Sequence, residues 1–153
     1  MKRLLLIAAI VIGCLVGGAQ SGCATTALPA ATGADSQATS VSAGDAGLAR
    51  AFAERASNLE VEGQGTVARL LTDDTAGARH QRFIVRLASG QTLLVTHNID
   101  IAPRVSYLRV GDAVSFKGVY EWNAEGGLIH WTHHDPTESH PTGWIRHNGR
   151  TYQ

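Results

Sequence analysis

The chain has 153 residues, with 13 basic and 13 acidic side chains and seven histidines. This length allows one domain together with a leader and a linker. The balanced charge lacks the basic excess of proteins that bind nucleic-acid phosphates, so we do not expect a nucleic-acid partner. Both cysteines, Cys14 and Cys23, come early in the chain, so no disulfide is expected inside the main domain.

Residues 1–23 predict a secretory signal peptide. Two basic residues precede an apolar run at 4–16 that is short for a permanent transmembrane helix. Cleavage within 19–27 would release a soluble periplasmic protein. Alternatively, the small residues before Cys23 would make it the lipid-modified first residue of a lipoprotein, attached to the membrane through that anchor alone. Both hypotheses predict an exported protein, in the periplasm or anchored to a membrane facing the periplasm or the cell surface.

Residues 24–44 are rich in Ala, Thr, Ser and Gly and lack hydrophobic periodicity, so we interpret them as a flexible linker. Residues 45–60 predict an amphipathic helix that packs on the domain behind it, with Asp45 able to cap its start. The apolar stripe of this helix consists of Leu48, Phe52, Ala56 and Leu59.

Residues 61–153 contain short apolar segments separated by turn residues, which predict a mainly β domain. A short helix is expected within 100–108, because Asp100 can cap it and Pro103 suits a first helical turn. Three strands, a helix and a two-strand hairpin are the order of a small five-stranded Greek-key barrel of the OB-fold kind. The expected strands are 65–71, 81–88, 91–97, 113–122 and 128–134.

Several long motifs occur in order between residues 65 and 153. They are RHQRFIVRL, HNIDIAPR, GDAVSFKGVYEWN, GGLIHWTHHDP and GWIRHNGRTYQ. Together they resemble an exported bacterial family known only as a domain of unknown function. The resemblance implies such a barrel and an envelope location, and it brings no catalytic residue. The last motif predicts a hairpin around Asn148-Gly149, with Trp144 packed over the barrel.

The segment GGLIHWTHHDP contains three of the seven histidines. A turn at 124–127 would pair Glu121 with His130 on one face of the hairpin and Tyr120 with Trp131 on the other. Only the second face is apolar enough to fill a barrel. We therefore expect Glu121 and His130 to belong to a site and Trp131 to lie in the core.

A Glu–His pair can bind a metal, transfer protons or form a structural ion pair, and the sequence leaves all three open. His130 and His134 on one strand would lie about 13 Å apart, so a divalent metal would need another ligand or a bend. The metal candidates are Glu121, His130 and His134. The acid–base candidates are Glu121, His130, His134, Asp74 and His80. The ligand-binding candidates are His97, Asp100, Arg104, His130, His133, His134 and Asp135.

The leading functional hypothesis is a small binding module of the envelope with a His-rich polar surface. Its partner would be a small ligand, a glycan or an envelope protein. The first alternative is a metal- or acid–base-dependent hydrolase, resembling phosphodiesterases only through the shared fold. The second alternative is a structural envelope lipoprotein.

Overall fold

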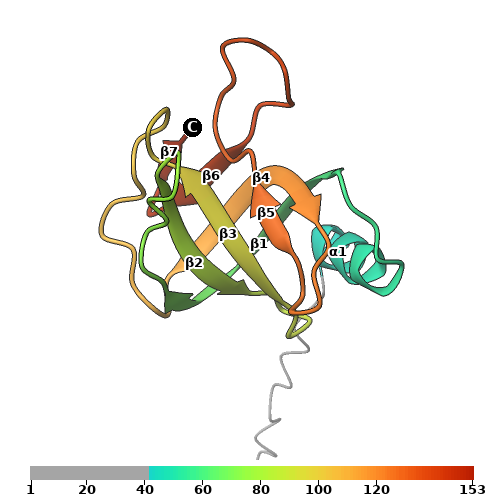
Figure 1. Ribbon diagram of the computed structural model, residues 1–153. Helices are drawn as coiled ribbons and strands as arrows, with labels where there is room; N and C mark the ends of the chain where they lie inside the picture. The colour runs from blue at the N-terminus through green and yellow to red at the C-terminus, as the bar shows by residue number, and fades with distance from the viewer. Residues whose placement is uncertain (1–41) are drawn as a thin grey trace, which may run out of the picture. The chain divides into compact units, whose positions relative to one another are not determined.

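The computed structural model describes residues 42–153, which form a closed five-stranded β-barrel with a helix beside it (Figure 1). The mainly β, OB-like barrel predicted from the sequence is confirmed. The predicted signal peptide, the lipidation candidate Cys23 and nearly all of the predicted linker lie outside the described residues. Within residues 42–153, no helix is long and apolar enough to cross a membrane.

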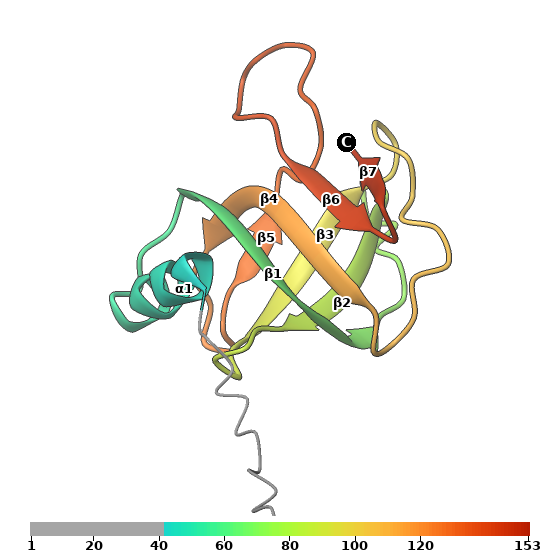
Figure 2. The same cartoon turned by 180° about the vertical axis from the view of Figure 1, so that it is seen from behind.

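The barrel closes because the long first strand changes partner along its length. Its first part pairs with β4 and its last part with β2, so the order β1-β2-β3-β5-β4 returns to β1. The pair β3–β5 is parallel, and β6 follows β5 along the same edge of β4 (Figure 2). The elements are α1 (Ala43–Ala53), β1 (Leu59–Leu70), β2 (His80–Arg86), β3 (Thr92–Asn98), β4 (Ala113–Glu121), β5 (Leu128–His130), β6 (Trp144–His147) and β7 (Arg150–Tyr152).

Along each strand, side chains point alternately into the core and towards the outer surface. In β2, Phe83 and Val85 are buried, whereas Arg82, Ile84 and Arg86 lie on the outer face. Burial of the inner apolar side chains is the main stabilising contribution to a domain without disulfides in its described part. The largest of these side chains are Tyr120, Phe83, Phe116, Leu48, Leu93, Ile129 and Ile145.

Helix α1 packs on the barrel as expected, but it starts and ends earlier than the sequence predicts. Its cap is Ser42, whose Oγ accepts a hydrogen bond from the Asp45 amide at 3.1 Å. Asp45 was expected to be the cap; instead its carboxylate accepts from the Ser89 amide at 3.3 Å. Leu59 is not helical and begins β1, because Arg55 and Asn58 adopt left-handed backbone angles.

The helix predicted within 100–108 is absent, because side chains of the barrel hold the backbone groups that a helix would use. Gln81 donates to the Val105 carbonyl at 3.2 Å and accepts from the Val105 amide at 2.8 Å. His97 Nε2 donates to the Pro103 carbonyl at 3.0 Å. Tyr107 also has a left-handed φ of 57°. The segment is therefore a series of turns fixed to β2 and β3.

The predicted register of the β4–β5 hairpin is wrong by two residues. Tyr120 pairs with Ile129 and Glu121 with Leu128, so the connection spans 122–127. Trp122 leaves the ladder because its amide donates to Ser57 Oγ at 2.9 Å, near α1. Strand β5 ends at His130 and does not reach residue 134. The C-terminal hairpin of β6 and β7 forms as predicted, with Trp144 buried.

Candidate functional site

Trp131 lies at the surface, and the prediction that it belongs to the core is wrong. Its backbone is left-handed, with φ of 52°, and its side chain is 39% exposed. A left-handed bulky residue is uncommon and breaks the alternation of the strand. The two residues after it, Thr132 and His133, are both buried. The indole ring consequently lies outside the barrel, directly after β5.

Three histidine rings contact the indole of Trp131, and one of them, His140, stacks on it. The His140 ring lies 4.1 Å from the Trp131 ring, nearly parallel to it, and the His130 ring lies 5.2 Å away. His133 meets the indole edge-on at 5.8 Å and His140 edge-on at 4.9 Å. These contacts hold the indole in one orientation.

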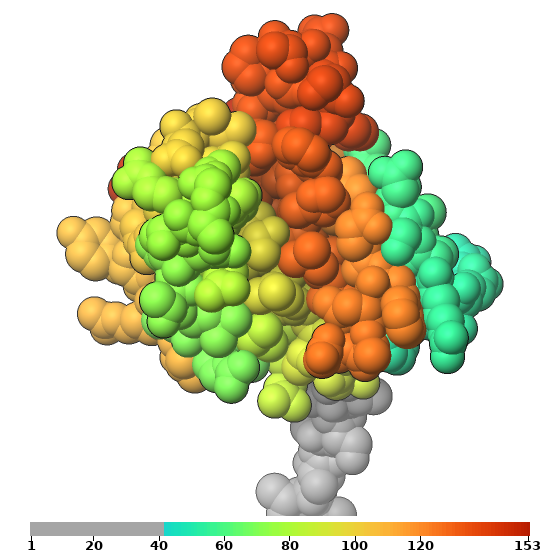
Figure 3. Space-filling model, viewed as in Figure 1, coloured from blue at the N-terminus to red at the C-terminus, as the bar shows by residue number. Residues whose placement is uncertain are grey.

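Residues 131–143 form a loop that projects from the barrel, drawn red-orange at the top of Figure 1 and Figure 3. Asp135 lies at its centre, and the Ser139 and Thr137 groups that donate to it hold its pKa well below the usual range. Gly143 closes the loop by donating to the His133 carbonyl at 3.0 Å. The donors to Asp135 are the amides of Thr137, Ser139 and His140 and the hydroxyls of Thr137 and Ser139.

Glu121 and His130 come together as predicted, although the predicted register was wrong. A shift of two residues leaves every side chain on its original face. Glu121 Oε1 lies 3.6 Å from His130 Nε2, beyond hydrogen-bond distance, and Nε2 has no other partner in residues 42–153. Burial lowers the pKa of His130, while the Glu121 carboxylate opposes that shift. The lowered pKa favours the uncharged form of the His130 imidazole near neutral pH.

His97 and His133 are buried and hydrogen-bonded. The Pro103 carbonyl accepts from His97 Nε2, so the neutral ring accepts from Thr132 Oγ1 through Nδ1 at 2.9 Å. His133 Nδ1 donates to the His134 carbonyl at 2.9 Å. Burial lowers the pKa of both rings. The His97 contacts tie β3 to the segments on either side of it.

The other predicted charged residues are engaged in ion pairs. Asp100 accepts from the Arg79 amide and Nε at 2.7 and 2.6 Å, which lowers its pKa. Arg104 donates through both terminal nitrogens to Asp73 at 2.6 and 3.0 Å, which lowers the pKa of Asp73. Each pair links the β1–β2 connection to the β3–β4 connection.

Asp74 and His80 meet through their backbones rather than through their side chains. Each amide donates to the other residue's carbonyl at 2.9 Å. Asp74 Oδ1 accepts from the Ala76 amide at 3.0 Å, and His80 Nδ1 donates to the Ala78 carbonyl at 2.8 Å. Each of the two side chains therefore forms a hydrogen bond within its own turn.

The metal candidates do not converge. His134 is exposed, with Nδ1 3.4 Å from Thr142 Oγ1, and it is not part of the Glu121–His130 pair. Among residues 42–153, no group of three or more His, Cys, Asp or Glu side chains is arranged to hold a metal ion. A divalent cofactor therefore remains a prediction from the sequence, without a ligand set in this part of the chain.

The exposed indole forms one wall of a groove of about 410 Å³. Its polar positions come from the start of β1 and from the projecting loop, and its apolar positions come from β4 and the loop. We call this groove, together with His130, the Trp131 shelf. The groove is lined by Asn58, Glu60, Val119, Trp131, Ser139, His140 and Pro141.

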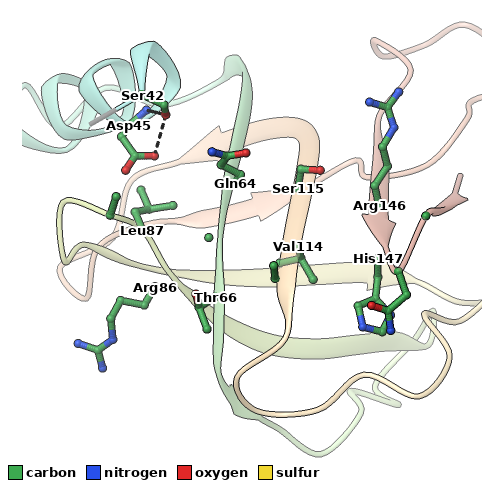
Figure 4. A pocket seen from close by; sticks show the side chains of 15 residues that line it. Ser42, Asp45, Gln64, Thr66, Arg86, Leu87, Val114, Ser115, Arg146 and His147 are labelled. Atoms are coloured by element: carbon green, nitrogen blue, oxygen red, sulfur yellow. Dashed lines mark hydrogen bonds between the residues drawn. The ribbon is translucent and has the colours of Figure 1, made fainter. Parts of the chain in front are cut away.

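A larger groove of about 580 Å³ lies between α1, β1, β4 and the β6–β7 hairpin (Figure 4). Gln64, Thr66 and Ser115 give it a polar surface, while the side chains of Arg86 and Arg146 extend away from its middle. None of the site residues predicted from the sequence lines it.

The comparison with family models identifies the same unit as the fold does. A family described as "Protein of unknown function (DUF3465)" matches residues 33–153. The chain belongs to the DUF3465 family. No curated protein matches the sequence. The resemblance seen in the sequence motifs is thereby confirmed, and the family description assigns no activity to the DUF3465 domain.

Sequence reasoning missed all four polar residues that line the groove of the shelf: Asn58, Glu60, Ser139 and His140. His140 follows an Asp whose neighbours at two and four residues are Thr and Ser, a spacing typical of side-chain-capped turns. That pattern could have predicted an ordered loop in the DUF3465 domain. Asn58 and Glu60 have no comparable signal, because the barrel closure brings them to the loop.

Proposed function

We propose that this DUF3465 domain is a binding module of the cell envelope and that the Trp131 shelf binds a sugar-containing ligand. The observation that carries the proposal is the exposed Trp131, fixed between histidines in a left-handed conformation. Strained backbone conformations of this kind concentrate at functional sites. A preformed aromatic wall with a few polar groups around it is the usual composition of a small-ligand site.

The chemistry of the shelf suits a polyhydroxylated ligand. A flat indole offers apolar area to the C–H face of a sugar ring at little cost in conformational entropy. Asn58, Glu60 and Ser139 supply hydrogen-bonding groups along the groove. Barrels of the OB kind also bind oligosaccharides in other proteins, which supports the proposal by analogy.

The envelope location rests on the N-terminal sequence, whose basic start and apolar run are typical of an exported protein. Cys23 would carry the lipid anchor if the protein is a lipoprotein. Release of the Cys23→Ser variant from membranes into the soluble fraction would support this anchor, and unchanged partitioning would contradict it.

The test is a binding assay with neutral, amino and acidic oligosaccharides, monitored by tryptophan fluorescence and calorimetry. At least one sugar should bind, and Trp131→Ala should weaken it by about tenfold or more. The same substitution should cost only about 1 kcal/mol of unfolding free energy in urea, because the ring is largely outside the core. The matched control is His134→Ala, an exposed loop residue that is not part of the shelf. Absence of binding to every sugar, or full binding by Trp131→Ala, would contradict the proposal.

The hydrolase hypothesis has one observation in its favour, the unpartnered His130 Nε2 facing Glu121. Such a pair could transfer a proton in hydrolysis. We expect no cleavage of the bound oligosaccharides or of bis(p-nitrophenyl) phosphate. Cleavage that disappears in both Glu121→Gln and His130→Ala would replace the binding proposal with an enzymatic one.

A further inference from the structure

A third groove, of about 490 Å³, lies on the outer face of β1, β2 and β3 beside the β4–β5 loop. We call it the β2–β3 groove. Its floor is apolar, because Ile84 pairs with Leu94 across the outer face. The groove is lined by Ala68, Arg69, Leu71, Ile84, Arg86, Thr92, Leu94, Asn123, Glu125 and Gly127.

A β-bulge turns Arg69 towards this groove. Val67 pairs with Val85 in the core, whereas Arg69 pairs with Ile84, so the register shifts between them. Without the extra residue, Arg69 would lie on the same buried face as Val67, since side chains alternate with a period of two. Bulges of this kind re-aim side chains and are common beside functional sites.

Arg69 and Arg86 together form a cationic wall. Arg86 lies two positions beyond Ile84 on β2, so it is a diagonal cross-strand neighbour of Arg69, with backbones about 7–8 Å apart. Long side chains at that separation can reach one anion. In residues 42–153, neither arginine forms an ion pair with an acidic side chain. Other arginines of the barrel, Arg79 and Arg104, are paired.

The opposite wall is held rigidly by the β4–β5 loop. Gln91 Nε2 donates to the Gly126 carbonyl at 2.7 Å, and Asn123 Oδ1 accepts from the Gly127 amide at 2.9 Å. Thr92 Oγ1 donates to the Glu125 carbonyl at 3.3 Å. Glu125 therefore stands across the groove from the two arginines. Its charge would orient an anionic ligand with the negative group towards Arg69 and Arg86.

We propose that the β2–β3 groove binds a small amphiphilic anion. The apolar body of the ligand would lie on Ile84 and Leu94, and its phosphate or carboxylate group would accept hydrogen bonds from Arg69 and Arg86. Guanidinium groups suit such oxyanions because they donate two parallel hydrogen bonds. This site is separate from the Trp131 shelf and does not depend on the function proposed for it.

The probe is 1-naphthyl phosphate, which combines an aromatic body with one anionic group. It should bind the isotope-labelled full chain and shift the amide resonances of residues lining the groove, Ile84 and Leu94 among them. Inorganic phosphate and 1-naphthol each lack one half of the probe and should bind at least about tenfold more weakly, since both recognition elements are needed. Equal binding of either fragment, or shifts confined to the Trp131 shelf, would overturn the proposal.

The matched variants are Arg69→Gln, Arg86→Gln and, as control, Arg109→Gln, which removes one exposed charge from the β3–β4 connection. The first two should each weaken 1-naphthyl phosphate binding by about tenfold, while the control leaves it unchanged. All three should keep the melting temperature of the parent, because these side chains are at the surface. Trp131→Ala should bind the probe normally, so this result is independent of the sugar-binding test. Unchanged binding by both groove variants would overturn the proposal.

Discussion

At the residue scale, the histidines of this domain differ in whether both ring nitrogens have hydrogen-bond partners. His97 is fully buried and uses both ring nitrogens, one as donor to Pro103 and one as acceptor from Thr132. His130 retains a free nitrogen beside Glu121. Residue type alone therefore does not distinguish a site histidine from a core histidine; the partners of its two nitrogens do.

The buried histidines predict that the domain loses stability on acidification. Burial lowers the pKa of His97, His130 and His133, so the folded state disfavours their protonated forms. The unfolded chain then binds more protons as pH falls below about 6.5, and the free energy of unfolding falls with it. Above that pH the three rings are neutral in both the folded and the unfolded state, so their protonation no longer reduces the free energy of unfolding. Urea unfolding at pH 8 and at pH 5.5 should show the lower midpoint at pH 5.5.

The contribution of His97 can be separated from the others by substitution. His97→Gln lacks the titrating group, so its unfolding midpoint should depend less on pH than that of the parent, even if its stability at pH 8 is lower. Folding of the variant is checked by its circular dichroism at pH 8. A folded His97→Gln protein with the full pH dependence would show that the buried ring is not a source of the effect.

At the element scale, hydrogen bonds and close backbone contacts fix the conformation of the loop 131–143. Asp135 organises its turn, and Gly143 lies so close to the Trp131 and Lys117 carbonyls that any Cβ there would clash with the backbone. The loop is thus a fixed part of the shelf. Its order comes from polar contacts rather than from hydrophobic alternation.

Replacing glycine by alanine should have opposite effects at two positions, because Gly143 closes the loop in a crowded place and Gly47 lies in open space. Gly143→Ala should destabilise the domain by about 1–3 kcal/mol, the usual cost of overpacking a rigid site. Gly47→Ala is the matched control: it lies within α1 with open space around it, so it should stabilise by about 0.5–1 kcal/mol. Urea unfolding of both variants measures the difference. Equal midpoints would show that the loop gives way at Gly143 and is not rigid.

The sequence predicts the barrel better than it predicts the site, and particular residues show why. The alternation of inward-facing Phe83 and Val85 with outward-facing neighbours is a local signal that predicts a strand. The same alternation, extended past His130, predicts Trp131 in the core. The left-handed turn there depends on Gly143, twelve residues later, and on the closed barrel beneath it. Local periodicity carries no information about such a contact.

The prediction of a helix at 100–108 is wrong for a similar reason. Asp100 and Pro103 are compatible with a helix start, but their neighbours bond to β2 and β3. Tertiary hydrogen bonds from Gln81 and His97 replaced the helical ones. The prediction that Glu121 and His130 lie on one face is correct, because a register shift of two residues leaves every side chain on its original face.

At the scale of the whole molecule, the Trp131 shelf and the β2–β3 groove both lie on the outer surface of one closed barrel. The Trp131 shelf combines an aromatic wall with imidazole side chains, whereas the β2–β3 groove combines an apolar floor with two guanidiniums that form no ion pair within residues 42–153. The inner face of the sheet is filled by the core. The two proposed sites are therefore built from outward-facing side chains and from the loops between strands.

The fold also predicts where the autonomous unit begins. Leu48 of α1 is fully buried and packs over Gly63 towards Phe116, and Trp122 Nε1 donates to the Phe52 carbonyl at 3.2 Å. Helix α1 is thus part of the core even though it lies outside the barrel. A fragment of residues 42–153 should fold with the stability of residues 33–153, the range of the family match.

A fragment of residues 59–153 should be much less stable, although it keeps every strand. Removing Leu48 alone forfeits about 1.5–3 kcal/mol of apolar burial, and each lost hydrogen bond to Phe52, Ser57 or Asp45 adds about 1 kcal/mol. The total is a large fraction of the 5–15 kcal/mol that is typical of a domain. Urea unfolding of the three fragments measures the loss, with Leu48→Ala in residues 42–153 as the intermediate case, at about 2–5 kcal/mol. If residues 59–153 unfold at the same urea concentration as residues 42–153, α1 is an appendage, and the barrel alone carries the stability of the domain.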